Sequence, residues 1–206
     1  MKKILLLFFL LSVSSLPVCS QMMERLFMAA PDSVVPLLDE NDRFELVEYA
    51  KAGMKSRVSN RLEDESVLKE IGTDYLFLQT TGISSMQMKL LPVGSDTVIC
   101  VVNSVKVEAE DSRVAFFDSK WNRFPGDRLF KSPSIREFFQ PSDTVGQYVD
   151  MCDIYLVSLR LNANDNTLVA EYTMPDYMGA EDAALVRPLL RKLVYRWDGT
   201  RFVIGD

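Results

Sequence analysis

Carboxylates are the side chains in this sequence with the clearest capacity for chemistry, because they gather in short clusters. The clusters are Glu63-Asp64-Glu65, Glu108-Ala109-Glu110-Asp111 and Glu181-Asp182. A glycosidase-type pair needs one carboxylate removed from water and a second across a cleft. Each cluster instead lies where its neighbours predict a turn, so we expect all three at the solvated surface. Glu171 lies within a predicted strand and is expected on the exposed face, opposite Tyr172.

Histidine is absent from the 206 residues, which removes Ser-His-Asp and Cys-His catalysis and the commonest metal ligand. Asn162, Asn164 and Asn166 alternate like the start of a calcium loop. Thr167 and Thr173 stand where that loop needs glycine and glutamate, so a polar turn is expected instead. Phosphate-binding, serine-nucleophile and zinc-protease motifs are missing from the sequence. We therefore assign no catalytic, cofactor-binding or metal-ligating residue and expect no cofactor; an enzymatic role is uncertain and disfavoured.

Two tryptophans offer a stacking platform for sugar rings, provided that they are exposed. Trp121 and Trp197 lie at matched positions in two similar segments, Phe117–Phe124 and Val194–Phe202. Matched positions favour a packing role over ligand stacking.

Basic residues are concentrated near the C-terminus. They are spread over a predicted loop and one strand, so we expect charge at the rim of the fold, with a patch for an anion or an acidic partner as the alternative. The residues are Arg187, Arg191, Lys192 and Arg196.

The first residues have the pattern of a secretory signal peptide. Lys2 and Lys3 precede an apolar run over residues 4–13, and small residues lead up to Ser20, before Gln21. A helix of about ten apolar residues is too short for a bilayer, which needs about 20. We expect cleavage near Ser20/Gln21 and a periplasmic or secreted protein.

Cys19 raises the alternative of a lipoprotein. Val18 stands where a lipidation signal prefers a small residue, so lipidation through Cys19 is less favoured. Removal of the leader leaves Cys100 and Cys152, both in apolar, strand-like segments. Two buried free thiols are favoured over a disulfide, because a disulfide needs a close Cα approach that the sequence alone leaves undetermined.

Composition places the chain among ordinary globular proteins. It is 48% hydrophobic and 25% charged, with a formal net charge of −6. Loss of Lys2 and Lys3 with the leader makes the charge more negative still. An acidic chain lacks the cationic surface that phosphate neutralisation requires, so nucleic acid is excluded as a general partner.

Hydrophobic periodicity predicts short helices followed by strands. Spacing typical of a helix covers residues 22–30 and 43–54, the second opened by Asp42 and Glu45 as a capping box. A short helix is also expected over 134–139. Alternation typical of strands then covers 74–80, 85–91, 96–107, 113–118, 154–161, 168–174, 193–197 and 201–204, with a hairpin at Asp198-Gly199.

These elements predict an α+β fold with antiparallel sheets. We divide the chain into a signal peptide (1–20), a helical start with a first α+β unit (21–124), a linker region (125–150) and a second α+β unit (151–206). The two similar aromatic segments favour two tandem helix-plus-meander units. One continuous antiparallel sheet with helices on a single face is the alternative.

The order of several motifs resembles an uncharacterised family of secreted Bacteroidales proteins known only as a domain of unknown function. The motifs are PDSVVPLLDENDRFELVEYAKAGM, YLFLQTTGISSMQMKLLP, TVICVVNSV and FFDSKWNRF, and the resemblance spans about residues 22–206. The resemblance implies no chemistry and supplies no catalytic residue. The helix-plus-meander units are more distantly similar to PepSY-like and beta-lactamase-inhibitor-like folds, and a shared fold does not give function.

We expect a non-enzymatic binding or interaction protein of the cell envelope. Its contact surface would be an exposed sheet face or edge, or the groove between the two units. A carboxylate-based hydrolase or glycan-binding protein is the alternative. The expected partner is an unknown envelope protein or glycan, and the chain is not expected to span a membrane. The sequence leaves open the identity of the partner, the oligomeric state and the choice between periplasm and exterior.

Overall fold

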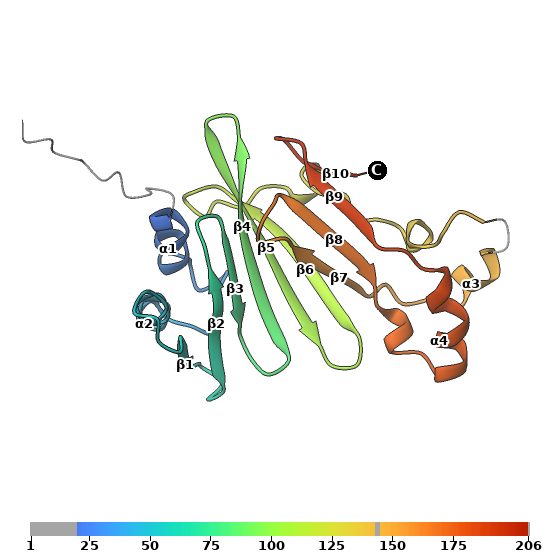
Figure 1. The fold of residues 1–206 in the computed structure, drawn as a ribbon, viewed down its shortest axis with the longest axis horizontal. Helices are drawn as coiled ribbons and strands as arrows, with labels where there is room; N and C mark the ends of the chain where they lie inside the picture. Colours follow the sequence, from blue (N-terminus) through green and yellow to red (C-terminus); the bar gives the residue numbers. More distant parts are fainter. Residues whose placement is uncertain (1–19, 143–144, 206) are drawn as a thin grey trace, which may run out of the picture.

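The computed structural model describes residues 20–142 and 145–205. Apart from Ser20, the predicted signal peptide lies outside these residues. The α-helices are α1 (Ser20–Met28), α2 (Glu40–Lys51), α3 (Gly146–Asp150) and α4 (Ala180–Val186). Short 3-10 helices cover Gly126–Arg128, Ile135–Phe138, Met174–Asp176 and Arg187–Leu189. Together with two antiparallel sheets they form the α+β fold that the sequence predicts (Figure 1).

Every pairing in the two sheets joins strands that are neighbours in the sequence. The first sheet has the order β1-β2-β3-β4-β5-β6 and the second the order β10-β9-β8-β7. The first contains β1 (Arg57–Ser59), β2 (Glu65–Ile71), β3 (Tyr75–Gln79), β4 (Ser84–Val93), β5 (Asp96–Lys106) and β6 (Glu110–Phe117). The second contains β7 (Val157–Leu161), β8 (Thr167–Tyr172), β9 (Leu193–Trp197) and β10 (Phe202–Ile204).

The first sheet buries both of its faces, because its central strands β4 and β5 carry buried side chains on both sides. One face packs with residues of α1 and α2 such as Phe27 and Leu46. The sheet residues on that face include Leu76, Leu78, Met86, Met88, Ile99 and Val101. The opposite face packs with the second sheet through Tyr75, Leu91, Cys100, Val102 and Phe116. The first sheet is therefore the middle layer, and one core is shared by both sheets.

The edge of β7 meets the first sheet through side chains instead of strand pairing. Ser112 Oγ accepts a hydrogen bond from the Leu159 N–H at 3.0 Å, and Gln87 Oε1 accepts one from the Leu161 N–H at 2.8 Å. Asp111 Oδ1 accepts from Val157 N at 3.4 Å. These acceptors satisfy backbone donors that a sheet edge otherwise leaves without partners.

A buried lysine adds a second polar link between the sheets. Lys89 is 1% exposed, and its Nζ lies 2.9 Å from Asp74 Oδ2. The same Nζ donates to the carbonyl of Ala163, in the β7–β8 turn, at 3.1 Å and lies 5.9 Å from the ring centre of Tyr75. The ammonium group thus has a carboxylate, a carbonyl and an aromatic ring as partners, which a buried charge requires.

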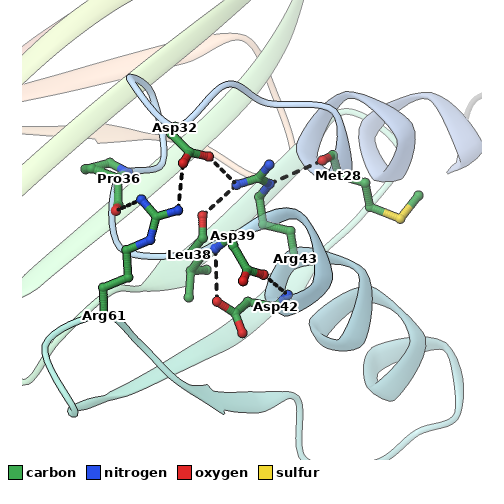
Figure 2. A network of polar contacts seen from close by, with 8 residues as sticks. All are labelled: Met28, Asp32, Pro36, Leu38, Asp39, Asp42, Arg43 and Arg61. Carbon is green, nitrogen blue, oxygen red and sulfur yellow. Dashed lines mark hydrogen bonds and ion pairs between the residues drawn. The ribbon is translucent and has the colours of Figure 1, made fainter.

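A buried arginine ties the N-terminal helices together (Figure 2). Arg43, in α2, is 4% exposed and donates to the carbonyls of Leu38 at 2.6 Å and Met28 at 3.2 Å. Its guanidinium also lies 3.6 Å from Asp32. Met28 is the last residue of α1, so Arg43 satisfies a carbonyl at the end of that helix.

Asp32 gives this network a dependence on pH. Its carboxylate accepts a hydrogen bond of 2.6 Å from Arg61, and that bond lowers the pKa of Asp32 from its ordinary value. A carboxyl whose pKa is depressed in the folded state stabilises the fold above its unfolded pKa, and this stabilisation is lost as the pH falls through the folded pKa.

We therefore expect Asp32→Asn to lower the Tm at neutral pH, and the difference from the wild type to shrink as the pH falls below about 4. Thermal unfolding followed by circular dichroism over this range measures the effect. Asp96→Asn is the control, because Asp96 is exposed and joins no ion pair within the described residues. An equal, pH-independent Tm difference for both variants would contradict the prediction.

Cys100 and Cys152 are both buried and free. Burial raises the pKa of each thiol above its ordinary value. Because the thiolate is the reactive form, both groups are expected to resist alkylation.

We expect a thiol-blocking reagent to leave both cysteines unmodified in the native protein and to modify both after unfolding without reductant. Intact mass of the chain cut before Gln21 counts the modified thiols. Modification that appears only after reduction would instead indicate a disulfide.

Several boundaries differ from the sequence prediction. The second helix begins at Glu40, because Asp39 and Asp42 form its capping box, where the sequence suggested Asp42 with Glu45. β1 and β2 were not predicted as strands, since β1 has three residues and β2 contains a register shift after Leu68. β6 begins at Glu110, three residues earlier than the alternation indicated.

The prediction of two tandem helix-plus-meander units is not confirmed. The first sheet has six strands preceded by α1 and α2, whereas the second has four strands with α4 between β8 and β9. The two similar segments share a turn instead. Asp118 accepts from the N–H groups of Lys120 and Asn122, and Asp198 accepts from those of Thr200 and Arg201.

Candidate binding site at the open edge of the first sheet

The acidic clusters differ in their exposure. Residues 63–65 and Glu181-Asp182 are exposed, as expected. Glu110 is an exception, because it is 9% exposed and its carboxylate accepts from Arg160 at 2.7 Å and Ser158 at 3.0 Å. Within the described residues, no three His, Cys, Asp or Glu side chains are placed to hold a metal ion.

Both tryptophans pack against aromatic neighbours. Trp197 lies 5.2 Å from the ring of Phe202, and its indole N–H donates to the carbonyl of Pro92 at 2.8 Å. Trp121 lies 5.4 Å from the ring of Phe117. Both are half-buried, and these contacts give each tryptophan a packing role.

The C-terminal basic residues lie at the rim of the fold. Arg187 pairs with Asp176 at 2.8 Å and Lys192 with Glu171 at 2.9 Å. Arg191 donates to the carbonyl of Glu137 at 3.1 Å. Three of the four residues thus have partners within the fold, while Arg196 is exposed.

The outer edge of β6 carries backbone groups that are open to a partner. In an antiparallel strand, alternate residues direct both N–H and C=O to the same side. Phe116 directs its carbonyl outward to Phe124 N at 2.9 Å, and Glu110 directs its carbonyl outward to Thr173 Oγ1 at 2.5 Å. Ser112 and Val114 lie between them with the same alternation.

The N–H and C=O groups of Ser112 and Val114 have no hydrogen-bond partner among residues 20–142 and 145–205. The edge is thus closed at both ends, by Phe124 and by Thr173, and open between them. Unpaired edge groups of this kind accept an added strand.

A pocket of about 290 Å³ lies against this open stretch. Its apolar lining comes from Val114, Phe130, Val157 and Leu159, and Arg113 and Arg123 contribute two exposed guanidinium groups. The remaining lining residues are Ser112, Gly126, Asp127, Ser132 and Tyr155. The pocket therefore combines open backbone groups, an apolar floor and positive charge.

The segment after β6 forms the far wall of this pocket. Phe130 anchors the segment, because it is 5% exposed and packs edge-on against Tyr195 at 5.0 Å. Tyr155 donates to the carbonyl of Pro133 at 2.9 Å, and burial raises the pKa of its hydroxyl. Tyr155 therefore stays neutral near pH 7, and it serves the pocket as a hydrogen-bonding group.

Three larger pockets lack this combination of features: the first, of about 390 Å³, includes neither Ser112 nor Val114 in its lining, and the two others differ in their charges. One, of about 420 Å³, lies beside Glu110 and Arg160, whose charges already satisfy each other. The other, of about 730 Å³, lies between the end of α2 and β2 and is lined by charges of both signs, including Lys69 and Glu70.

The sequence did not single out Arg113 or Arg123 as site residues. They are ten positions apart, and the bridge between Arg123 and Phe117 returns the chain alongside β6. An Arg in an alternating strand is the ordinary signature of an exposed face, so only the strand order identifies Arg113 as an edge residue.

No helix in the described part of the chain has the length and apolar character needed to cross a membrane.

The model of a family described as "Protein of unknown function (DUF3256)" matches residues 15–202. A solved structure of a domain of an uncharacterized protein from Porphyromonas gingivalis W83 is similar, with a TM-score of 0.77 and 26% sequence identity. The alignment covers 89% of this chain and 98% of that one. No curated protein matches.

Proposed function

This chain belongs to the DUF3256 family of proteins of unknown function, and we propose that it is a non-enzymatic binding protein that receives an extended segment of a partner protein. The observation that carries the proposal is the open stretch of the β6 edge at Ser112 and Val114. A segment lying there gains main-chain hydrogen bonds from the edge and apolar contact with the pocket floor.

The lining of the pocket supports binding over catalysis. Nucleophilic catalysis needs a nucleophile within hydrogen-bond reach of a base that a third group orients. In the described lining, Ser112 Oγ is bonded to the Leu159 N–H and to Ser104 Oγ, and the Tyr155 hydroxyl is bonded to a carbonyl. These hydroxyls position the two sheets and the pocket wall.

We place this binding outside the cytoplasm. The support is the pattern of the first residues, where Lys2 and Lys3 precede the apolar run 4–13 and a small residue, Ser20, precedes Gln21. The partner is accordingly a protein of the same envelope or of its exterior.

Site-specific photocrosslinking in the native cell tests the proposal. A photoreactive residue in place of Arg123 is expected to capture a partner, and the crosslinked peptide is expected to map to one extended segment of it. The same photoreactive residue in place of Arg196, at an exposed position of β9, is the matched control. It is expected to capture none of the proteins that position 123 captures.

Val114→Pro sharpens the test. Proline removes the outward N–H of Val114 and leaves the ladder with β5 intact, so an edge position tolerates it. We expect this variant to fold, as circular dichroism checks, and to lose the crosslink at position 123. A crosslink that persists in Val114→Pro, or one shared with position 196, would overturn the proposal.

A further inference from the structure

Building on the proposed function, we infer that the β6 edge selects an extended partner segment in which an acidic residue is flanked by apolar ones. The acidic side chain lies over Arg113 and Arg123, and its apolar neighbours lie on the pocket floor.

The two arginines have unused charge. No ion pair joins Arg113 or Arg123 to a carboxylate in the described residues, although nine other Lys and Arg side chains there form such pairs. Asp127 is the one carboxylate among the described lining residues, against two guanidinium groups. The pocket thus carries positive charge on an otherwise acidic protein of net charge −6, and a ligand carboxylate complements it.

The alternation of β6 sets the pattern of the ligand. Arg113 lies between the two open positions, Ser112 and Val114. Its side chain therefore extends from the face of the strand opposite to the side chains of those two residues. Val114 belongs to the side of the sheet that packs with Phe130 and Leu159. Side chains of an added strand alternate in the same way, so an acidic residue beside Arg113 places its neighbours over the apolar floor.

The short length of the opening makes the side chains decisive. Two residues between the closed ends offer few main-chain hydrogen bonds, and those bonds are independent of sequence. Discrimination among partner segments must therefore come from the guanidinium groups and the apolar floor.

Selection from a display library of randomised seven-residue segments against the purified protein tests the inference. We expect enriched segments to carry Asp or Glu between two apolar residues. In fluorescence anisotropy with an enriched peptide, replacing its acidic residue by the matching amide is expected to weaken binding about fivefold, and added salt is expected to reduce that difference.

Variants of the protein separate the charge from the edge. Arg113→Gln with Arg123→Gln is expected to bring the acidic peptide and its amide analogue to within about twofold of each other. Arg196→Gln is the control and should retain the full preference, because Arg196 lies on β9 away from the pocket. Val114→Pro is expected to weaken both peptides alike.

The outcomes distinguish this inference from the proposed function. Segments enriched without an acidic preference, and weakened by Val114→Pro, would overturn the inference and support the strand-binding function. Failure to enrich any segment, or binding that Val114→Pro leaves unchanged, would overturn both. A preference for acidic peptides that survives in the double glutamine variant would overturn the assignment to Arg113 and Arg123.

Discussion

Phe116→Ala is expected to lower the free energy of unfolding by about 3–5 kcal/mol. Phe116 is 0% exposed and lies on the face of the first sheet that packs with the second. Its ring centre is 6.4 Å from that of Phe202, in β10. Truncation leaves a cavity between the two sheets, where the backbones of both are held by strand pairing and collapse little. Urea unfolding monitored by tryptophan fluorescence and circular dichroism measures the loss.

Phe124→Ala is the matched control for this prediction. Phe124 is 37% exposed, and its contribution to the edge of β6 is a backbone N–H that alanine retains. The same chemical change there is expected to cost about 1 kcal/mol or less. Equal losses for the two variants would show that the space between the sheets is not tightly packed around Phe116.

Arg43→Met is expected to lower the free energy of unfolding by about 2–3 kcal/mol. Methionine approximates the length of the aliphatic stem but removes the hydrogen bonds to the carbonyls of Leu38 and Met28 and the contact with Asp32. The carbonyls of Leu38 and Met28 then lose the charged group that donates hydrogen bonds to them. Asp32 is itself exposed, so its charge returns to water and adds little to the cost.

Arg25→Met controls for the loss of an arginine from a helix in the same region. Arg25 lies on the exposed side of α1, and its replacement is expected to change stability by about 0.5 kcal/mol or less. Arg43→Lys is expected to fall between the wild type and Arg43→Met, because an ammonium group keeps the charge and reaches fewer acceptors. A methionine variant as stable as Arg25→Met would contradict the role given to Arg43.

Much of the sheet architecture could be predicted from the pattern of apolar residues in the sequence. Strands were expected over 74–80 and 96–107, and β3 and β5 cover Tyr75–Gln79 and Asp96–Lys106. The hairpin expected at Asp198-Gly199 joins β9 to β10, and Gly199 has the positive φ of 98° that such a turn favours. β3 and β5 are recognisable because they are short apolar runs rich in aromatic and β-branched residues, and residues 98–102 of β5 are all buried.

Other elements depend on contacts that a local pattern does not contain. β1 has three residues and exists through its pairing with β2, so it has no alternation long enough to detect. Lys89 and Glu110 appear in the sequence as ordinary surface charges. Their burial follows from the second sheet packing over β4 and β6, which brings Ala163 to Lys89 and Arg160 to Glu110.

The sequence could predict the type of contact surface but not which strand provides it. The sequence indicated a binding protein with a sheet edge, a sheet face or an inter-unit groove as its contact surface. The identity of the edge depends on the strand order, which makes β6 the last strand of the first sheet. It also depends on Phe124 and Thr173, which close the edge on either side of Ser112 and Val114.

The way in which β7 is joined to the first sheet has a consequence for folding kinetics. Strands within each sheet pair with their sequence neighbours. Apart from β8 and β9, which α4 separates, each pair closes a short loop at a small cost in chain entropy. The hydrogen bond from Leu161 to Gln87 spans 74 positions, and that from Leu159 to Ser112 spans 47. These acceptors are in place only once β4 and β6 are formed. We therefore expect the docking of β7 onto the first sheet to be slower than the closing of the hairpins within each sheet, because its contacts are non-local.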